Sequence, residues 1–430
     1  FLGARSSLFL PYKNLGLIIV DEEHDLSFKQ EDSIRYQARD LAIVKAKIEK
    51  IPIILSSATP SLETHNNIKN KKFKHLFLSS QFSGTDLPKI KIINLKKANL
   101  EKEKWISKMT QKGLESCLKK GEQALLFLNR RGYAPLALCN KCGYRYVCDQ
   151  CSSWLVMHKK TNKLLCHYCG SISKIHLNCK SCQKENSIKF IGPGVERVAE
   201  EVKLYFPNFN VKVMSSDNAN TPNKLKKITK DFEEKKIDIL VATQIMAKGH
   251  HFPNLSFVGV IDADTGLMGG DMRAIERTYN LLQQVSGRAG RSKKTGDVFI
   301  QTYYPEHPVI KSFQERDRKK FIEQILKERK EFKIPPFSFM TAIILSGSSK
   351  TNIESYANNF IKGMPLERDI HLMGPVEAPI YLLRGKYRYR ILLKGNKRKI
   401  LNDFTRNLIK KTPPPSTIRL TIDVDPYTFL

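Results

Sequence analysis

Short apolar runs that end abruptly in polar residues recur through the first part of the chain. They lie at residues 15–20, 51–55, 124–128, 237–241 and 257–261. Runs of about four to eight apolar residues without alternation are typical of parallel strands that are buried on both faces. Helix-like stretches, such as 35–49 and 223–235, separate these runs. This alternation of strands and helices predicts doubly wound α/β domains.

The polar residues after these runs lie where such sheets bind ligands, at the carboxyl ends of the strands. The first run leads into an Asp-Glu-Glu-His sequence at 21–24, and the last leads into Asp262 and Asp264. A strand-end Asp can hold Mg²⁺ on nucleotide phosphates while the adjacent Glu polarises the attacking water. Asp21 and Glu22 are therefore candidates for a nucleotide site.

A segment at 283–291 combines arginine with glycine. Arg288 and Arg291 are three residues apart, so on one helical turn both could reach a triphosphate. Gly287 and Gly290 disfavour a free-standing helix, and close approach of the backbone to a ligand explains them better. The segment therefore predicts a phosphate-binding element.

Eight of the nine cysteines form four C-x-x-C pairs. The pairs are Cys139/Cys142, Cys148/Cys151, Cys166/Cys169 and Cys179/Cys182. A two-residue gap lets both thiolates of a pair reach one tetrahedral metal at ~2.3 Å. Disulfides are the alternative, but they belong to oxidising compartments and the chain opens with no export signal. Eight thiolates therefore predict two closed structural Cys₄ zinc sites, and their spacing leaves nested and cross-braced pairing open. The ninth, Cys117, is expected to be a core residue.

The charge of the chain is strongly positive. Its 73 Lys and Arg residues outnumber 42 Asp and Glu, which gives a formal charge of +31. Such an excess points to a polyanion, with nucleic acid as the first candidate, although lysine could also be a generic surface residue. Lys386, Arg388 and Arg390 alternate with apolar residues, which predicts a strand with one basic face. That face could contact phosphates or simply be solvated.

Hydrophobic content and the length of the apolar runs bear on folding and on location. The hydrophobic fraction of 41% excludes wholesale disorder. No apolar run approaches the ~20 residues needed to span a bilayer, and no signal-peptide pattern is present. We therefore expect a soluble cytoplasmic protein and, in its simplest form, a monomer.

The motifs resemble those of a known family. Residues 21–24, 57–59 and 284–291 are similar to helicase motifs II, III and VI of superfamily 2. Residues 242–253 resemble motif V of the primosomal protein N′ (PriA) family of bacterial replication-restart helicases, and Gly192-Pro193-Gly194, the closing segment 422–426 and the cysteine pairs extend the similarity over essentially the whole chain.

The resemblance implies an α/β fold with two RecA-like helicase lobes, the first of them truncated. The expected divisions are the remainder of lobe 1 at 1–115, lobe 2 at 116–334 with a double Cys₄ zinc insertion at 139–183, and a small α+β C-terminal DNA- and partner-binding domain at 335–430. Within the insertion, the resemblance favours nested pairing, with Cys139, Cys142, Cys179 and Cys182 on one zinc and the inner four cysteines on the other.

The resemblance also implies roles for individual residues. Asp21 would bind Mg²⁺ of ATP, and Glu22 would be the catalytic base. Residues expected to act in catalysis or nucleotide binding with them are His24, Gln284, Arg288, Arg291 and Gly249. Residues expected to couple the nucleotide to DNA or to contact DNA are Ser57, Thr59, Phe28, Tyr36, Arg39, Gly192, Gly194, Thr243, Gln244, Lys248, Lys386, Arg388 and Arg390. Phe28 and Tyr36 lie in a segment, 28–39, that resembles the family's aromatic-rich loop, which senses single-stranded DNA.

By this resemblance the parent protein is an ATP-dependent 3′→5′ DNA helicase that recognises stalled or branched forks and initiates primosome assembly. Its expected partners are single-stranded and forked DNA, single-strand-binding protein and helicase-loading proteins. The chain lacks an initiator Met and any G-x-x-x-x-G-K-[ST] sequence. We therefore expect a fragment cut through lobe 1 that hydrolyses no ATP by itself. The alternative is a zinc-stabilised DNA-binding and partner-loading module without motor activity.

Overall fold

The chain forms two compact units. The first unit contains residues 1–76 and 322–430, and the second contains residues 77–166 and 171–321. The computed structural model describes residues 1–430 except 32–33, 79–86, 102–103, 129–135, 147–154, 159–162, 167–170, 174–177, 192–194, 215–220, 244–251, 268–272, 290–294, 363–368, 384 and 428–430.

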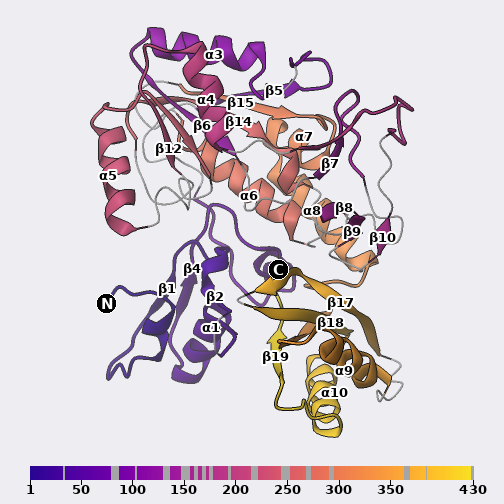
Figure 1. Ribbon diagram of the computed structural model, residues 1–430. Coiled ribbons are helices and arrows are strands. Elements are labelled where there is room, and N and C mark those ends of the chain that lie inside the picture. Colours follow the sequence, from indigo (N-terminus) through magenta and orange to yellow (C-terminus); the bar gives the residue numbers. More distant parts are fainter. Residues whose placement is uncertain are drawn as a thin grey trace. The chain divides into compact units, whose positions relative to one another are not determined.

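A six-stranded parallel sheet is the centre of the second unit (Figure 1). Its strand order is β12 (Val211–Met214), β13 (Ile239–Ala242), β6 (Gln123–Leu128), β14 (Leu255–Asp262), β15 (Asp297–Thr302) and β5 (Lys89–Asn94). Neighbouring strands are all parallel. Every residue of β6 is buried, as a central strand covered on both faces requires. The three strands predicted for this part of the chain are confirmed.

Helices cover both faces of this sheet. Alternate strand residues such as Ala124 and Leu126 pack with Leu114 of α3 (Lys108–Lys119) and Val198 of α4 (Val195–Tyr205). Figure 1 shows α6 (Ala274–Ser286) and α7 (Pro308–Glu315) on the other face. Helix α5 (Pro222–Glu233) begins at Thr221, whose hydroxyl accepts a hydrogen bond from the Lys224 amide.

The boundary between the units differs from the expected one at residue 115. Strand β5 pairs with β15 along its whole length, and α3 contacts β6, β14 and β15. Residues 89–119 therefore belong to the second sheet, and the division lies near residue 77. The apolar pattern of the sequence could not show which sheet β5 joins, because a strand has the same pattern whichever sheet it pairs with.

The cysteine-rich insertion has a sheet of its own. Its strand order is β10 (Ile172–Ser173), β9 (Lys163–Cys166), β8 (Leu155–His158), β7 (Leu136–Cys139) and β11 (Ile188–Ile191). Strand β11 pairs antiparallel with β7, so it closes the insertion. Its short apolar run is equally typical of a strand of the main sheet, and only the pairing shows that it belongs to the insertion.

The N-terminal part of the first unit contains a parallel pair, β1 (Ile18–Val20) and β4 (Ile53–Leu55), which confirms the other two predicted strands. Helix α1 (Ala38–Glu49) connects towards β4, and α2 (Leu62–Lys69) follows it with Ser61 as N-cap. Between β1 and α1 lie β2 (Lys29–Gln30) and β3 (Tyr36–Gln37), which pair antiparallel. Short 3₁₀ helices are η1 (Arg5–Phe9), η2 (Leu26–Phe28) and, in the second unit, η4 (Asp264–Gly266).

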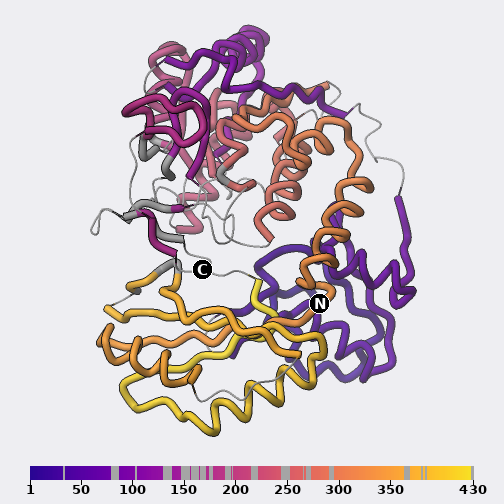
Figure 2. Tube along the Cα trace, turned by 90° about the vertical axis from the view of Figure 1, so that its right-hand side faces the viewer, coloured from indigo at the N-terminus to yellow at the C-terminus, as the bar shows by residue number. Residues whose placement is uncertain are grey.

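The C-terminal part of the first unit is a four-stranded antiparallel sheet. Its order is β17 (Ile370–Leu383), β18 (Lys386–Gly395), β16 (Phe339–Gly347) and β19 (Ile418–Val424). Helices α9 (Lys350–Lys362) and α10 (Arg398–Lys411) pack on one face through residues such as Phe360 and Leu408, against Ile343 and Ile391 of the sheet (Figure 2). Helix α8 (Arg318–Glu331) precedes the sheet. No helix in the described ranges is long and apolar enough to cross a membrane.

Helix α7 gives the fold a pH-sensitive element. Its N-cap is His307, whose Nδ1 accepts a hydrogen bond of 3.2 Å from the Val309 amide. Burial lowers the pKa of His307 to about 4. A lowered pKa means that the unfolded state binds a proton first as pH falls, so stability is full above pH ~6.5 and declines towards pH 4.

We predict that the second unit loses about 1–2 kcal/mol of stability from this residue between pH 6.5 and 4.5. The variant His307→Asn keeps a capping oxygen but does not titrate, so its loss over this range should be smaller by that amount. Urea unfolding of both proteins at each pH measures the difference. Parallel stability curves for the two proteins would contradict the assignment.

Candidate functional site

The acidic tetrapeptide lies directly at the carboxyl end of β1. Val20 is buried, whereas Asp21 and Glu22 are exposed, and Glu22 has a φ of 49°. The Glu22 amide donates a 3.0 Å hydrogen bond to Asp21 Oδ1. The turn therefore presents two adjacent carboxylates to solvent at the edge of a parallel pair, where a Mg²⁺–nucleotide complex could reach them.

His24 connects this turn to the residues that follow β4. Its Nδ1 lies 2.7 Å from Ser57 Oγ, and Thr59 Oγ1 lies 3.3 Å from the ring. Glu22 Oε2 is 3.5 Å from the same Nδ1. The Thr59 amide also donates to Ser57 Oγ at 2.9 Å. The structure thus brings His24, Ser57 and Thr59 together, and a shift of either strand end changes the hydrogen bonds of the other.

Glu23 points inward and pairs with Arg39. The carboxylate is 1% exposed; it accepts a 2.9 Å hydrogen bond from Arg39 Nη1 and a 2.6 Å bond from the Ser61 amide. Burial disfavours the Arg39 cation, but Tyr427, Asp40 and Glu23 outweigh it and raise its pKa. We expected Arg39 to contact DNA; the structure instead encloses its side chain, which connects α1 to the acidic turn.

The aromatic residues of segment 28–39 lie near the surface. Phe28 is half-buried at the end of η2, and Tyr36 stacks edge-on against Phe9 with ring centroids 5.2 Å apart. Both rings keep part of their surface accessible. They remain candidates for stacking on bases, which is worth ~1–3 kcal/mol per base.

The expected basic row of β18 is only partly open to solvent. Lys386 is exposed and Arg388 is half-buried, but Arg390 is 5% exposed. The prediction of a row of three solvent-facing cations is therefore wrong at Arg390. The cause is the register: Arg390 pairs with Ile344 on the sheet face that also carries Asp423, and all three residues are buried, whereas Lys386 lies at the exposed start of the strand.

Of the residues predicted to act on nucleotide or DNA in the second unit, three lie within the described ranges. Arg288, 8% exposed, follows the C-terminus of α6, Gln284 lies on its last turn, and Thr243 directly follows β13. Gly287 caps the helix, where an added Cβ would lie 3.2 Å from the Gln283 carbonyl oxygen. The predicted residues Gly192, Gly194, Gln244, Lys248, Gly249 and Arg291 lie outside the described residues.

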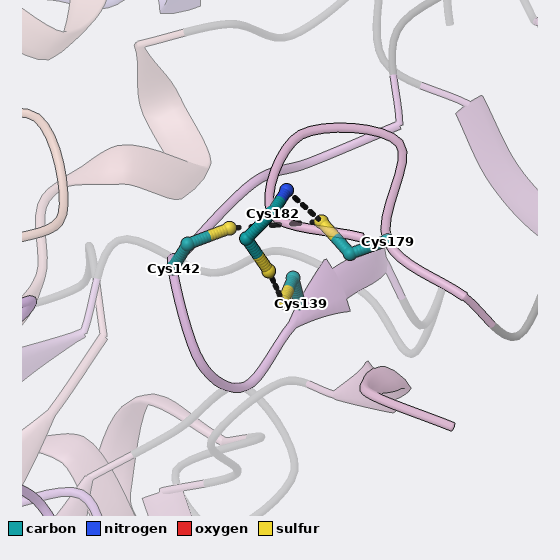
Figure 3. A group of neighbouring side chains, drawn as sticks. All are labelled: Cys139, Cys142, Cys179 and Cys182. Carbon is teal, nitrogen blue, oxygen red and sulfur yellow. Dashed lines mark hydrogen bonds between the residues drawn. The ribbon is translucent and has the colours of Figure 1, made fainter. Parts of the chain in front are cut away.

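Four cysteines converge in the insertion (Figure 3). The Sγ atoms of Cys139, Cys142, Cys179 and Cys182 all lie within 4.8 Å of one another. Cys139 and Cys182 are 3.7 Å apart, and Cys142 and Cys179 are 3.6 Å apart. Tetrahedral zinc with ~2.3 Å bonds requires sulfur atoms about 3.8 Å apart. The four thiols therefore have the spacing of a closed Cys₄ site, in the outer pairing that the resemblance implied.

Backbone amides donate hydrogen bonds to the sulfur atoms of this cluster. The Lys141 amide donates to Cys139 Sγ at 3.4 Å, and the Ser181 and Cys182 amides donate to Cys179 Sγ at 3.3 and 3.4 Å. Burial opposes ionisation of Cys139, but hydrogen bonds with Ser187 and with the Cys142 and Lys141 backbone outweigh it and lower its pKa to about 6, whereas burial raises the pKa of Cys142 and of Cys179. Such outer hydrogen bonds orient and stabilise metal ligands. The donor set fits zinc.

The inner four cysteines are not placed. Cys148, Cys151 and Cys169 lie outside the described residues, and of Cys166 only the backbone, in β9, is described. The second zinc site stays a prediction. Cys117 is 5% exposed and packs in the core between α3 and the sheet, as expected. Burial raises the pKa of its thiol to about 11.

A buried ion pair attaches the first cysteine knuckle, residues 139–145, to the main sheet. Arg145 lies three residues after Cys142 and is 6% exposed; its Nη2 is 3.1 Å from Asp264 Oδ2, which follows β14. The Tyr304 hydroxyl donates to the Gly143 carbonyl at 3.0 Å, and a Cβ at Gly143 would lie only 2.4 Å from Tyr303. Sequence reasoning singled out Asp264 but missed Arg145, since a basic residue beside a knuckle has no distinctive spacing.

Comparison with known proteins places the chain. Residues 330–427 match the model of the "Primosomal protein N C-terminal domain", and residues 160–293 match the "Helicase conserved C-terminal domain". The replication restart protein PriA of Rickettsia conorii is 46% identical over 428 residues, which cover 100% of this chain and 66% of that protein. The chain belongs to the PriA family.

A second PriA, from Haemophilus influenzae, is 38% identical over 99% of this chain and 58% of its own length. The chain thus spans about two thirds or less of these PriA relatives. Among solved structures it is similar to RecG bound to a three-way DNA junction, with 14% identity, a TM-score of 0.39, and 75% of this chain and 31% of that chain covered. That likeness is too low to carry an argument.

The zinc assignment predicts a metal content that can be measured. The purified chain should hold two zinc ions, and Cys182→Ser should lower the content by one, because three thiolates bind zinc far more weakly than four. Elemental analysis after extensive dialysis measures this. Cys117→Ala removes a cysteine outside the cluster and should leave two ions; an unchanged content in Cys182→Ser would contradict the site.

The Arg145–Asp264 pair predicts a stability effect. Arg145→Met leaves the Asp264 carboxylate buried without its cation, and should lower the free energy of unfolding by about 3 kcal/mol. The double variant Arg145→Met/Asp264→Asn should recover part of this loss. Lys119→Met, which removes an exposed i,i+4 partner of Glu115, should cost less than about 0.5 kcal/mol. If Arg145→Met unfolds at the same urea concentration as the parent protein and Lys119→Met, the Arg145–Asp264 pair does not stabilise the attachment of the insertion to the main sheet.

Proposed function

We propose that these 430 residues are the larger part of an ATP-dependent DNA helicase that restarts replication at stalled or branched forks. The observation that carries the proposal is the hydrogen-bonded connection of His24 with Ser57 and Thr59. It joins the acidic turn after β1 to the residues after β4. A motor needs such a connection, because nucleotide state and nucleic-acid contact must change together.

In this proposal the residues of the acidic turn act on the nucleotide. Asp21 would hold the Mg²⁺ of the nucleotide, and Glu22 would accept the proton of the attacking water. Both carboxylates are exposed, and Glu22 is 51% exposed in its side chain, so water can reach them. Arg288 and Arg291, with Gln284 nearby, stabilise the charge that develops on the γ-phosphate. Mg²⁺–ATP supplies the phosphoryl group, and all other roles belong to side chains of the chain.

The remaining features concern DNA and partners. The formal charge of +31 favours a polyanion, and Phe28 and Tyr36 offer rings for stacking on unpaired bases. We propose 3′→5′ movement on single-stranded DNA, recognition of forked DNA, cytoplasmic location and contacts with single-strand-binding protein and primosome proteins. The Cys₄ clusters hold two structural zinc ions. Family membership supports each of these proposals.

The 430 residues contain no G-x-x-x-x-G-K-[ST] sequence, which normally cradles the β- and γ-phosphates. We therefore propose that this chain hydrolyses no ATP by itself, and that the full-length protein does. A module that binds DNA and loads partners without a motor is the competing function, and the full-length protein distinguishes the two.

The proposed role of Glu22 predicts the effect of Glu22→Gln in the full-length protein. DNA-stimulated ATP hydrolysis should fall by about 10²–10⁴-fold, since the general base is lost, while DNA affinity stays within about twofold. Glu49→Gln, at the exposed end of α1 in the same part of the chain, is the matched control and should keep full activity. Equal rates for Glu22→Gln and the parent protein, or no ATP hydrolysis by the parent, would favour the module.

A further inference from the structure

A buried cluster of three charges joins the segment before α1 to the C-terminal sheet, within the first unit. Lys29 of β2 is 4% exposed, and its Nζ lies 2.6 Å from Asp423 Oδ1 of β19. The same Nζ donates to the Val424 carbonyl at 2.8 Å. Arg35, just before β3, donates from Nη1 to the other carboxylate oxygen at 2.9 Å. One carboxylate thus binds both ends of the connection between β2 and β3.

Strand register explains why Asp423 lies at this contact. Asp423 pairs with Ala342, and Ala342 pairs with Leu392 on the far side of β16. These residues alternate with Ile343 and Ile391, which pack against α9 and α10. Asp423 therefore lies on the sheet face opposite the helices. That face also carries Arg388, whose pKa is lowered by burial and by the nearby Arg35.

The strands held by Asp423 are connected to the acidic turn through Arg39, which follows β3 in the chain. Six residues after β2, β3 begins, and Arg39 in the first turn of α1 makes the buried pair with Glu23. The Arg39 guanidinium also lies over the ring of Tyr427, 6.0 Å from its centroid, just beyond β19. The C-terminal residues thus contact segment 29–39 at its start, through Asp423, and at its end, through Tyr427.

We propose that Asp423 is a positioning residue that fixes β2 and β3 through Lys29 and Arg35, and so sets how strongly DNA contact at Tyr36 is transmitted to Asp21 and Glu22. The inference rests on the proposed function, because it concerns the coupling of DNA contact to ATP hydrolysis. Asp423 touches neither nucleotide nor DNA in this assignment. It acts through Lys29 and Arg35, which in turn place Tyr36 and, through α1, the Arg39–Glu23 pair.

The arrangement has a mechanical consequence. With both cations bound to one buried carboxylate, the two ends of the β2–β3 connection keep a fixed separation. A base that stacks on Tyr36 then moves β3 and the start of α1 together. Because Arg39 in α1 pairs with Glu23, the movement also changes the position of Glu23. Without the Asp423 carboxylate, a base that stacks on Tyr36 moves only the residues around it, because Lys29 and Arg35 can each turn towards water.

The test compares variants of the full-length protein. ATP hydrolysis is measured with and without a single-stranded oligonucleotide, and the ratio of the two rates is the readout. Asp423→Asn should leave the DNA-free rate within about twofold of the parent and lower the ratio by about fivefold or more. Asp403→Asn, an exposed carboxylate of the same sheet domain that pairs with Arg406, should match the parent in both rates.

This readout separates positioning from folding. A purely structural role would lower both rates of Asp423→Asn together, through a smaller folded fraction, and leave their ratio unchanged; that result overturns the inference. Asp423→Glu keeps the buried charge, and therefore the fold, but moves it by about one bond length. Its ratio should fall to about half that of the parent, and a ratio equal to the parent's overturns the inference even if Asp423→Asn does not fold.

The outcomes also distinguish this inference from the proposed function. If the parent shows no DNA-stimulated hydrolysis, the proposed function fails, and the inference fails with it. If the parent is stimulated and Asp423→Asn is stimulated equally, only the inference fails.

Discussion

A charged side chain can be buried only when an opposite charge accompanies it, and this constraint determines where the parts of each unit meet. Glu23 is enclosed with Arg39, Asp423 with Lys29 and Arg35, and Asp264 with Arg145. The Asp423 and Asp264 contacts join segments far apart in sequence, and the Glu23–Arg39 pair joins the turn after β1 to α1. Removing one partner leaves the other charge uncompensated, so each contact has a defined geometry, whereas apolar packing tolerates small shifts.

Two of these pairs also lie beside a candidate functional motif. Glu23 is adjacent to the two exposed carboxylates, and Arg145, the partner of Asp264, closely follows the cysteine pair Cys139/Cys142. In both units, therefore, a residue beside a functional motif is fixed by an element that has a different task. This arrangement allows a contact made at one element to change the geometry at another, provided that the pair stays intact.

Much of this could be predicted from the sequence. The five apolar runs specified five strands, because a fully buried strand tolerates few polar residues. The cysteine spacing specified knuckles, and the resemblance specified which four cysteines converge. Strand partners were harder to predict: β5 and β11 have ordinary apolar patterns, and only their pairing shows to which sheet they belong. The burial of individual arginines could not be predicted from the sequence. Arg39 and Arg390 look like surface cations in the sequence, and their burial depends on Glu23, Tyr427 and the register of β16.

The proposed function requires the full-length protein to be a helicase that moves 3′→5′. Strand displacement on two synthetic forks measures this: one fork carries only a 3′ single-stranded arm and the other only a 5′ arm. We expect ATP- and Mg²⁺-dependent separation of the substrate with the 3′ arm and little separation of the other. Separation of neither substrate, or preference for the 5′ arm, would contradict it.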